Sequence, residues 1–432
     1  MTASADKGRY LERGGVCFQD ACIAYEARQE LARLAEQGKL PAGGVPLPWI
    51  EHEGRPLCAE AVLGIQAKLL QELLDRLATE SAFYKDMLAQ HAETAADLRQ
   101  TASRLWQELA AGALLADVAG LEAGLRQNLA RLPMTRPADI ADMGRFVCGS
   151  QDRIDRIVTL STSGTTGTPK RLAFTETDLM RTARFFANGM AQIVAPGERL
   201  LVCLPGSERP GGVADLLKRG LELRGTRVEA LASPRSGTDG MAELLDAVRD
   251  FRPHSLVMSP RQLEGLYAIF GSQAPDGLQS LLVSSDWCDP ALAEKVRQAW
   301  DIEIIDHYGI TESCFGAALE CVRHDGMHIR HLDLLVEIVD PVTGESLPAG
   351  KIGEIVFTTL RQEAMPLLRY RTGDASWLVP GPCVCQSPSA RLGSILGRFE
   401  EGSRHINHPL KAERCHVLAG ADPFEACTGA RS

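Results

Sequence analysis

The sequence predicts an α/β protein with a helical N-terminal part, mostly parallel sheets flanked by helices, and a small antiparallel β region. Three observations predict this order. A helical apolar pattern starts at Val62, short apolar runs alternate with helix-length segments over residues 199–305, and two longer apolar runs follow from Leu334. Strands that alternate with helices are typical of βαβ units, in which helices cover both faces of a parallel sheet.

The N-terminal part predicts helices after an extension of unknown role. The first 55 residues contain a helix-like run, DACIAYEARQELARLAEQG, and a Pro/Gly-rich break, KLPAGGVPLPW, to which we assign no chemistry. From there, apolar residues recur at spacings of three and four: Val62, Ile65, Leu69, Leu73 and Leu77. This stripe predicts an amphipathic helix. More helix is expected to about Leu132, before the Pro-marked loop LPMTRPADI.

The middle of the chain predicts the parallel sheet. Strands are expected at RLLVCLP, RVEALA, SLVMS, LQSLLVSSD and IEIID, and helices at GMAELLDAVRDF and PALAEKVRQAW. Ligands of such sheets bind at the carboxyl ends of the strands. Further along, LLVEIVDPVTGESLPAGKIGEIVFTTL predicts two antiparallel strands joined across a Pro/Gly turn.

Composition limits the function classes. The chain has 432 residues, more than one ordinary core needs, and a formal net charge of −10. A net negative charge argues against a nucleic-acid or anionic-membrane surface, since both need a basic face. There is neither an apolar run of about 18 residues nor an apolar signal core at the N-terminus, so we expect a cytoplasmic protein. The twelve cysteines are then expected to be thiols or metal ligands rather than disulfides.

Residues 161–170, STSGTTGTPK, combine hydroxyls, two glycines and a lysine. They lie between a predicted strand, DRIVTL, and a predicted helix, ETDLMRTARFFANGM. Gly164 and Gly167 allow consecutive amide N–H groups to point into one concavity, and Lys170 adds a positive charge. This combination suits a polyphosphate, although it is not a Walker A loop. On composition alone, a surface Ser/Thr/Gly turn is an equal alternative.

Three further stretches favour a nucleotide-binding loop over a surface turn. TSGTTGTPK resembles the phosphate-binding signature of the adenylate-forming superfamily of acyl-CoA synthetases, peptide synthetase adenylation domains and luciferases. HYGITE at residues 307–312 resembles its adenine and magnesium motif, YRTGD at 370–374 its ribose motif, and Gly397–Arg398 the start of its hinge. All four occur in family order. SAFYKDML, LARLPMTRPADI, ECVRHDGMHI and EAMPLLRYRTGD make the chain most similar to phenylacetate–CoA ligases, over roughly residues 60–400.

This resemblance implies an ATP-dependent reaction in which a carboxylate attacks the α-phosphorus and pyrophosphate leaves. Lys170, Thr311 and Glu312 are the implied catalytic residues; Glu312 would bind Mg²⁺ and Thr311 would donate to the α-phosphate. The implied nucleotide contacts are Thr162, Ser163, Gly164, Thr165, Thr166, Gly167, Ser284, Ser285, Asp286, Asp306, His307, Tyr308, Gly309, Thr311, Asp374 and Arg398. Among them, Tyr308 would stack on adenine and Asp374 would accept the ribose hydroxyls.

The acid and its partners are less defined. CFGAAL after Glu312 and ARFFANGM at residues 183–190 are apolar, so an aromatic or other hydrophobic carboxylic acid is expected. The acyl acceptor would be CoA, as in the resembling ligases, or a thiol or amine of a partner protein. A homodimer is a family-level expectation, and no nucleic acid or membrane partner is expected.

A cysteine pair predicts a metal site. Cys383 and Cys385 are two residues apart, and Cys321 and His328 lie upstream in ECVRHDGMH. Cys, His, Cys, Cys is a complete tetrahedral zinc set, and some relatives of the phenylacetate–CoA ligases carry a structural zinc in this arrangement. His324 competes with His328 for the histidine position. Free thiols with surface histidines are the alternative.

The C-terminal part departs from the family pattern. We expect an N-terminal extension at 1–55, an adenylation domain at 56–396, and only a short remnant of the family's C-terminal domain at 397–432. Phe399 stands where the hinge aspartate is expected, and Lys411 is the lysine of a tail without a recognisable catalytic-lysine motif. Three functions therefore remain: an acid–CoA ligase in which a separate C-terminal-domain protein replaces the missing domain or the domain is dispensable, a stand-alone adenylating enzyme that passes acyl-AMP to a partner, and a non-catalytic nucleotide-binding protein.

Overall fold

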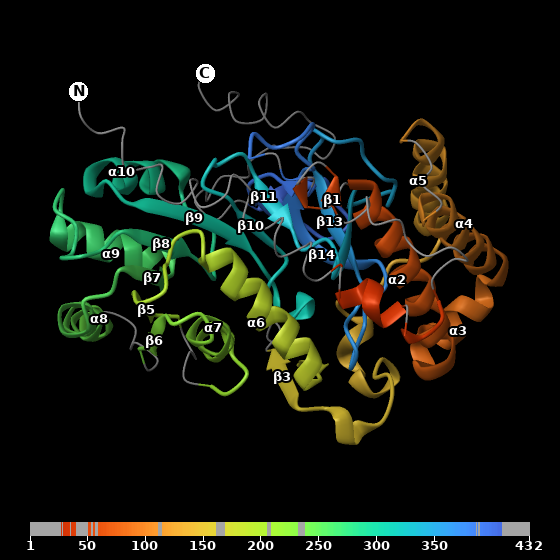
Figure 1. The fold of residues 1–432 in the computed structure, drawn as a ribbon, viewed down its shortest axis with the longest axis horizontal. Helices are drawn as coiled ribbons and strands as arrows, with labels where there is room; N and C mark the ends of the chain where they lie inside the picture. The colour runs from red at the N-terminus through yellow and green to blue at the C-terminus, as the bar shows by residue number, and fades with distance from the viewer. Residues whose placement is uncertain are drawn as a thin grey trace. The chain divides into compact units, whose positions relative to one another are not determined.

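The structure is a computed structural model that describes residues 27, 29–34, 36–39, 51–52, 55–56, 59–110, 115–160, 169–204, 209–231, 238–385, 387 and 389–407. The chain divides into two compact units. Figure 1 labels the helices and strands of both. Of the described residues, those within Leu179–His328 form the first unit, which we call the parallel-sheet unit. Those within Gln19–Asp178 and Ile329–Ser432 form the second, which we call the helical unit.

The parallel-sheet unit alternates strands and helices along the chain. Its elements are α6 (Glu176–Met190, of which the first turn belongs to the helical unit), β5 (Arg199–Val202), α7 (Val213–Glu222), β6 (Arg227–Ala230), α8 (Thr238–Phe251), β7 (Ser255–Met258), α9 (Pro260–Phe270), β8 (Ser280–Val283), α10 (Pro290–Trp300), β9 (Glu303–Tyr308), the short helix η5 (Thr311–Ser313), β10 (Ala318–Glu320) and β11 (Met327–Ile329). The strand order is β11-β10-β9-β8-β7-β5-β6. Pairing is parallel from β6 to β9 and antiparallel between β9 and β10. The predicted βαβ architecture is therefore confirmed.

Alternate residues of the parallel strands supply the core on one face of this sheet. Leu201, Leu256, Leu281 and Ile304 belong to one buried cluster with apolar residues of α8, α9 and α10. Side chains alternate between faces along a strand. The intervening residues, such as Leu200, Val257 and Ile305, are also buried, so both faces of the sheet are covered. Helix starts fit their sequences, because Ser259 and Asp289 cap α9 and α10 with a proline in the first turn.

The helical unit combines a helical part with small antiparallel sheets. Its elements are β1 (Glu51–His52), β2 (Arg55–Pro56), α2 (Ala59–Glu80), α3 (Ala82–Gln90), α4 (Ala92–Ala110), α5 (Leu115–Ala130), the short helices η2 (Asp139–Ala141), η3 (Met143–Arg145) and η4 (Gln151–Arg153), and strands β3 (Arg156–Leu160), β4 (Lys170–Phe174), β12 (Leu334–Val339), β13 (Gly353–Thr359), β14 (Tyr370–Ser376), β15 (Arg391–Leu392), β16 (Gly397–Phe399) and β17 (Ile406–Asn407). The main sheet has the order β12-β13-β14-β16-β17, and β12–β13 is antiparallel as predicted.

Polar contacts tie the helices of this unit to its C-terminal sheet. Gln66 Nε2 donates to the carbonyl of His331 at 2.7 Å. The hydroxyl of Tyr84, whose pKa burial raises, accepts the N–H of Leu368 at 2.9 Å. Thr135 Oγ1 donates to the carbonyl of Leu368 at 2.7 Å. The stripe predicted from Val62 to Leu77 is buried on α2, so the helix is confirmed.

One strand was not predicted. The helix predicted at ETDLMRTARFFANGM is confirmed as α6, but β4 precedes it and pairs antiparallel with β3, with Leu160 opposite Lys170. The Gly/Thr loop thus connects two strands of a hairpin. The segment KRLAF is short and contains no β-branched residue, so its sequence alone does not predict a strand. The strand forms because the segment pairs with β3.

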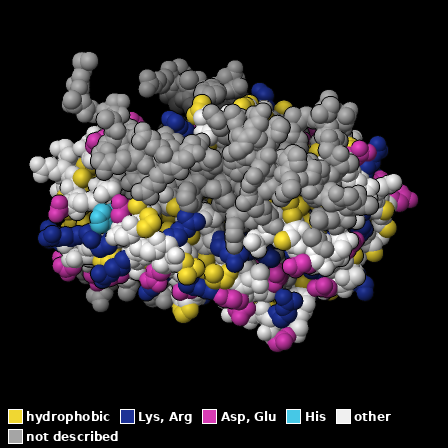
Figure 2. Space-filling model, in the orientation of Figure 1, with side chains coloured by type: hydrophobic (Ala, Val, Ile, Leu, Met, Phe, Trp, Pro, Cys, Tyr) yellow, Lys and Arg dark blue, Asp and Glu magenta, His cyan; other side chains and the backbone are white. Residues whose placement is uncertain are grey.

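The surface carries both signs of charge. On the face drawn in Figure 2, the described Lys and Arg side chains are interspersed with Asp and Glu. Within the described part of the chain, no helix is both long and apolar enough to cross a membrane.

Candidate nucleotide site and metal centre

The chain turns sharply where β9 ends. Tyr308 is buried, and the carbonyl of Tyr308 accepts the N–H of Ala317 at 3.0 Å. Gly309 follows, and a Cβ there would lie only 2.0 Å from the carbonyl oxygen of Phe315. The glycine is therefore required because the returning chain packs directly on it. The turn leads into η5, which holds Glu312 with a buried side chain.

The turn after η5 adopts a strained backbone. Cys314 and Phe315 are consecutive non-glycine residues with φ of 53° and 71°. Such conformations persist only where the surroundings hold them. Thr182 on α6 is one such contact, since its buried Oγ1 donates to the carbonyl of Cys314 at 3.0 Å. The turn that carries Thr311 and Glu312 is thus fixed from the neighbouring helix.

The two apolar segments predicted to line an acid pocket meet in this unit. A Cβ on Gly316 would lie 2.8 Å from Phe185 Cδ1 and 3.0 Å from Phe186 Cε1. A Cβ on Gly189 would lie 2.1 Å from Leu319 Cδ2. The small residues after Glu312 therefore pack closely on the phenylalanines of α6.

The carboxyl ends of β8 and β9 lie side by side. Val283 is the parallel partner of Asp306, so Ser284–Asp286 follow β8 next to the place where Asp306–Tyr308 end β9. Ser284 is buried, Ser285 has a φ of 73°, and Asp286 is exposed. Two of the predicted nucleotide motifs are thereby brought together, as expected for ligand loops of a parallel sheet.

Burial perturbs two titratable groups at the end of β9. Burial, with the nearby Glu320 carboxylate, raises the pKa of Asp306 to about 7. Burial lowers the pKa of His307 to about 4. At neutral pH the His307 ring is uncharged and contributes no cation, while Asp306 is partly protonated.

A charged clamp holds the loop between β10 and β11. His324 Nε2 lies 2.7 Å from Glu303 Oε1, and His324 Nδ1 lies 3.1 Å from Glu320 Oε2. Hydrogen bonds to Glu303 and to Glu320 raise the pKa of His324 to about 9, so the ring is charged at neutral pH. His324 is therefore committed to two carboxylates.

In the helical unit, Asp374 lies on β14 with its side chain buried. Arg398 on β16 is its cross-strand partner, and Arg398 Nε donates to Asp374 Oδ1 at 2.8 Å. The predicted ribose residue and the predicted hinge arginine are thus joined in one sheet. The β16 and β17 strands close that sheet beyond residue 396.

The phosphate loop lies largely outside the described residues. Thr162, Ser163, Gly164, Thr165, Thr166 and Gly167 belong to residues 161–168, which the structure does not describe. Lys170 is described, half-buried, as the first residue of β4. Most of residues 1–55 and all of 408–432, including Lys411, also fall outside the described part.

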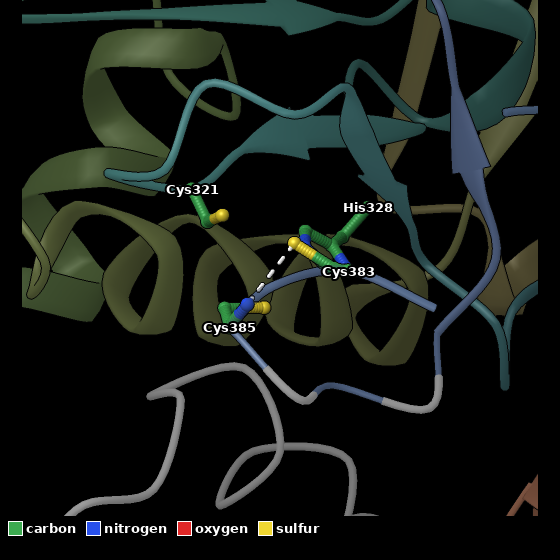
Figure 3. Close-up of side chains that lie close together, drawn as sticks. All are labelled: Cys321, His328, Cys383 and Cys385. Carbon is green, nitrogen blue, oxygen red and sulfur yellow. Dashed lines mark hydrogen bonds between the residues drawn. The ribbon is translucent and has the colours of Figure 1, made fainter. Parts of the chain in front are cut away.

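The candidate zinc ligands gather into one cluster. The ligand atoms of Cys321, His328, Cys383 and Cys385 all lie within 4.8 Å of one another, and Figure 3 shows the four side chains converging. Cys321, His328 and Cys383 are buried. Cys385 N donates to Cys383 Sγ at 3.4 Å, the dashed line in Figure 3.

Local backbone contacts explain the cluster. Cys321 and His328 flank the loop between β10 and β11. Directly after His328, Ile329 N donates to the carbonyl of Ala390 at 3.0 Å, which holds the segment just beyond Cys385 beside β11. Ligands of a tetrahedral zinc with Zn–S of about 2.3 Å lie about 3.8 Å apart, so this set fits one ion with small side-chain shifts. Between the two histidines the geometry selects His328, because His324 is held by Glu303 and Glu320.

The other described cysteines that the structure buries away from this cluster are Cys148, Cys203, Cys288 and Cys314. Burial raises the pKa of Cys148 to about 11 and those of Cys203 and Cys288 to about 12. At neutral pH the thiols of Cys148, Cys203 and Cys288 therefore stay protonated, which makes them poor nucleophiles and poor metal ligands. Cys17, Cys22 and Cys58 lie outside the described residues.

Sequence patterns did not predict the residues that fix the backbone around the predicted nucleotide-binding residues. Thr182 and Glu354 belong to no motif, and each acts through a hydrogen bond to a residue far along the chain or on the next strand. For Glu354, the Gly-Glu step before a run of apolar residues marks a strand and no more. The one signal available from the sequence is a carboxylate within a strand predicted to be apolar, because charged side chains are rare in such strands.

Comparison with known proteins places the chain in a family. The sequence profile of the family described as AMP-binding enzyme matches residues 122–360. The chain belongs to this family. It is 35% identical over 301 residues to the phenylacetate-coenzyme A ligase of Thermus thermophilus, and 32% identical over 288 residues to that of Pseudomonas putida. These matches cover 66% and 64% of this chain but only 65% and 62% of the relatives' lengths.

Solved structures agree on the fold. A crystal structure of 2-hydroxyisobutyryl-CoA ligase in complex with 2-HIB-AMP and CoA matches with a TM-score of 0.61 at 18% identity. The match covers 81% of this chain and 69% of that one. The adenylate-forming fold predicted from the four motifs is thereby confirmed.

Proposed function

We propose that this chain activates a carboxylic acid with ATP and transfers the acyl group to CoA. A carboxylate oxygen attacks the α-phosphorus and pyrophosphate leaves, which yields acyl-AMP. A CoA thiolate then attacks the acyl carbon and AMP leaves. The observation that carries the proposal is the turn after β9. In this member of the AMP-binding family, Tyr308 and Gly309 lead into η5, which carries the buried Glu312.

The chemistry of the residues supports this assignment. Bringing two anions together requires hydrogen-bond donors and a divalent cation to offset their repulsion. Glu312 is a hard oxygen ligand that suits Mg²⁺, which when bound would neutralise phosphate charge. In this proposal Thr311 donates to the α-phosphate, Asp374 accepts the ribose hydroxyls, and Lys170 with residues 162–167 holds the terminal phosphates.

The acid is proposed to be aromatic or otherwise apolar. The packing of Phe185 and Phe186 on Gly316 supports this class, because it offers apolar surface next to the turn after β9. The relatives named phenylacetate-coenzyme A ligases point to the same class.

Pyrophosphate exchange tests the proposal. Purified protein is incubated with ATP, Mg²⁺ and labelled pyrophosphate, together with a panel of aryl and alkyl acids, with and without CoA. Exchange with acid-dependent CoA consumption supports the ligase. Exchange without CoA consumption would instead select an adenylating enzyme that serves a partner protein, and no exchange despite ATP binding would leave a binding protein.

Glu312→Ala provides the matched variant for the magnesium role. We expect exchange to fall by roughly 10²–10³-fold, since mutations that remove transition-state charge stabilisation have losses of this order. The thermal unfolding midpoint serves as the control for folding. Exchange at the wild-type rate in the variant would refute the magnesium assignment.

We also propose that Cys321, His328, Cys383 and Cys385 hold a structural Zn²⁺. Four protein ligands fill a tetrahedral site and leave no position for substrate. Metal analysis of wild type is expected to give close to one zinc per chain and Cys383→Ser to lose it, with Cys203→Ser as the control for a buried cysteine elsewhere. Equal zinc in wild type and Cys383→Ser would refute the site. Because zinc needs reduced thiolates, the proposal includes a reducing, cytoplasmic setting.

A further inference from the structure

We propose that Glu354 is the positioning residue for Asp374. Its buried carboxylate fixes the turn from which Asp374 is presented to the ribose. The inference rests on the proposed function, in which Asp374 accepts hydrogen bonds from the ribose hydroxyls of ATP.

Glu354 lies on β13, next to the strand that carries Asp374, and is 2% exposed. Its carboxylate receives Nε of Arg371 at 3.0 and 3.2 Å, and also the Nη2 of Arg371. An ionised carboxylate at this depth needs such a partner. Arg371 belongs to the same YRTGD segment as Asp374, so Glu354 is tied to that segment by charge.

The same carboxylate also holds the backbone of the segment. Gly373 N donates to Glu354 Oε1 at 3.0 Å. Gly373 has a φ of 79°, while a Cβ there would meet nothing within 4 Å. A glycine is therefore favoured at this position by the left-handed backbone and not by lack of space. Glu354 stabilises this left-handed backbone by accepting the N–H of Gly373.

The strand pairing explains why a side chain is needed. Glu354 pairs with Ala375 and Val356 pairs with Arg371, so Thr372, Gly373 and Asp374 together face Ile355 alone. Ladder hydrogen bonds are interrupted in such a bulge, and bulges re-aim side chains at sites. Thr372 Oγ1 donates to the carbonyl of Ile355 at 2.8 Å and accepts Asp374 N at 3.0 Å. Glu354 supplies the acceptor for Gly373 that the ladder does not.

Glu354→Gln separates positioning from general stability. An amide replaces one of the two acceptor oxygens with an NH2 donor, so either Gly373 N–H, which Oε1 accepts, or Arg371 Nη2, which Oε2 accepts, loses this partner. We measure binding of ATP and of 2′,3′-dideoxy-ATP by calorimetry, because the second nucleotide lacks the ribose hydroxyls that Asp374 would bind. We expect Glu354→Gln to weaken ATP binding roughly tenfold, equivalent to about 1.4 kcal/mol, and to change dideoxy-ATP binding by less than about twofold.

Three further variants complete the test. In an Asp374→Asn background, Glu354→Gln should weaken ATP no further, because the two residues act as one unit. Gly373→Ala perturbs the same turn without touching the buried pair, and should also weaken ATP selectively; it decides the matter if Glu354→Gln does not fold. Asp333→Asn, whose carboxylate pairs with Arg330 and Arg361 in the same unit, is the matched control and should leave both affinities unchanged.

The outcomes distinguish this inference from the proposed function. Wild-type protein that binds no ATP would overturn the proposed function. Wild type that binds ATP and dideoxy-ATP equally would overturn the ribose role of Asp374, and this inference with it. Wild type that discriminates between them, with folded Glu354→Gln discriminating equally well, would overturn this inference alone.

Discussion

We expect substitutions in the ion pair between Arg369 and Glu337 to reduce the free energy of unfolding of the helical unit strongly. Arg369 is 1% exposed and directly precedes the segment that carries Asp374. Its Nε and Nη2 donate to the two oxygens of Glu337 at 3.1 and 3.0 Å. Its Nη1 donates to the carbonyls of Ala130, at the end of α5, and Leu132 at 2.8 and 2.5 Å. One side chain therefore joins β12, β14 and the end of a helix.

Replacing Glu337 with Gln removes the charge partner and leaves the guanidinium buried. Breaking a buried pair from one side costs about 3–5 kcal/mol. For denaturant unfolding this is a decrease in the urea midpoint on the order of 1 M or more. Fluorescence of Trp377, which packs on a buried cluster of this unit, and circular dichroism report the transition.

A second variant checks the physical cause. Glu337→Leu with Arg369→Met removes both charges, but it also leaves the carbonyls of Ala130 and Leu132 without this donor. We therefore expect the double variant to recover only part of the loss, about 1–2 kcal/mol. A decrease in the free energy of unfolding of less than about 1 kcal/mol for Glu337→Gln would refute the reasoning. Such a small cost would mean that the Arg369 guanidinium is still solvated when it loses its partner.

Two other predictions concern the parallel-sheet unit. Because hydrogen bonds to Glu303 and Glu320 raise the pKa of His324 to about 9, the stabilising charge of its ring is fully present below about pH 6.5 and is lost as pH rises through 9. The carboxylate of Glu294 on α10 also interacts with this charge. Wild type should lose about 1 kcal/mol more than His324→Gln between pH 6.5 and 9.5 in urea unfolding, allowing for partial exposure; equal pH dependence of the two would contradict this. Gly309→Ala places a Cβ against the carbonyl of Phe315, so it should cost about 1–3 kcal/mol and abolish pyrophosphate exchange, while Gly120→Ala, with open space around it, should do neither; an active, stable Gly309→Ala protein would show that the turn after β9 can widen.

Local patterns were enough for the parts that depend on short-range order. The apolar stripe from Val62 to Leu77 predicted α2, and the alternation of apolar runs with helix-length segments predicted the parallel sheet. Because parallel strands end at one edge, the neighbouring positions of Ser284–Asp286 and Asp306–Tyr308 followed from the order of elements.

Other features depend on contacts between distant parts of the chain. The hairpin of β3 and β4 forms through pairing, and the pattern of KRLAF alone did not predict it. His324 and His328 are equally good ligands by type, and the positions of Glu303 and Glu320 decide between them. Likewise, nothing in the spacing of Glu354 reveals that its carboxylate reaches Gly373 across a bulge.

The sequence by itself predicted the class of chemistry, because TSGTTGTPK, HYGITE and YRTGD are short, contiguous motifs that can be recognised without the structure. The tertiary structure decided what holds those groups in place. Buried carboxylates, strained turns and a cysteine cluster acquire their partners only when register and packing bring distant residues within hydrogen-bond distance. Those energies are absent from any local pattern, so Thr182, Glu354 and Arg369 emerged only from the folded chain.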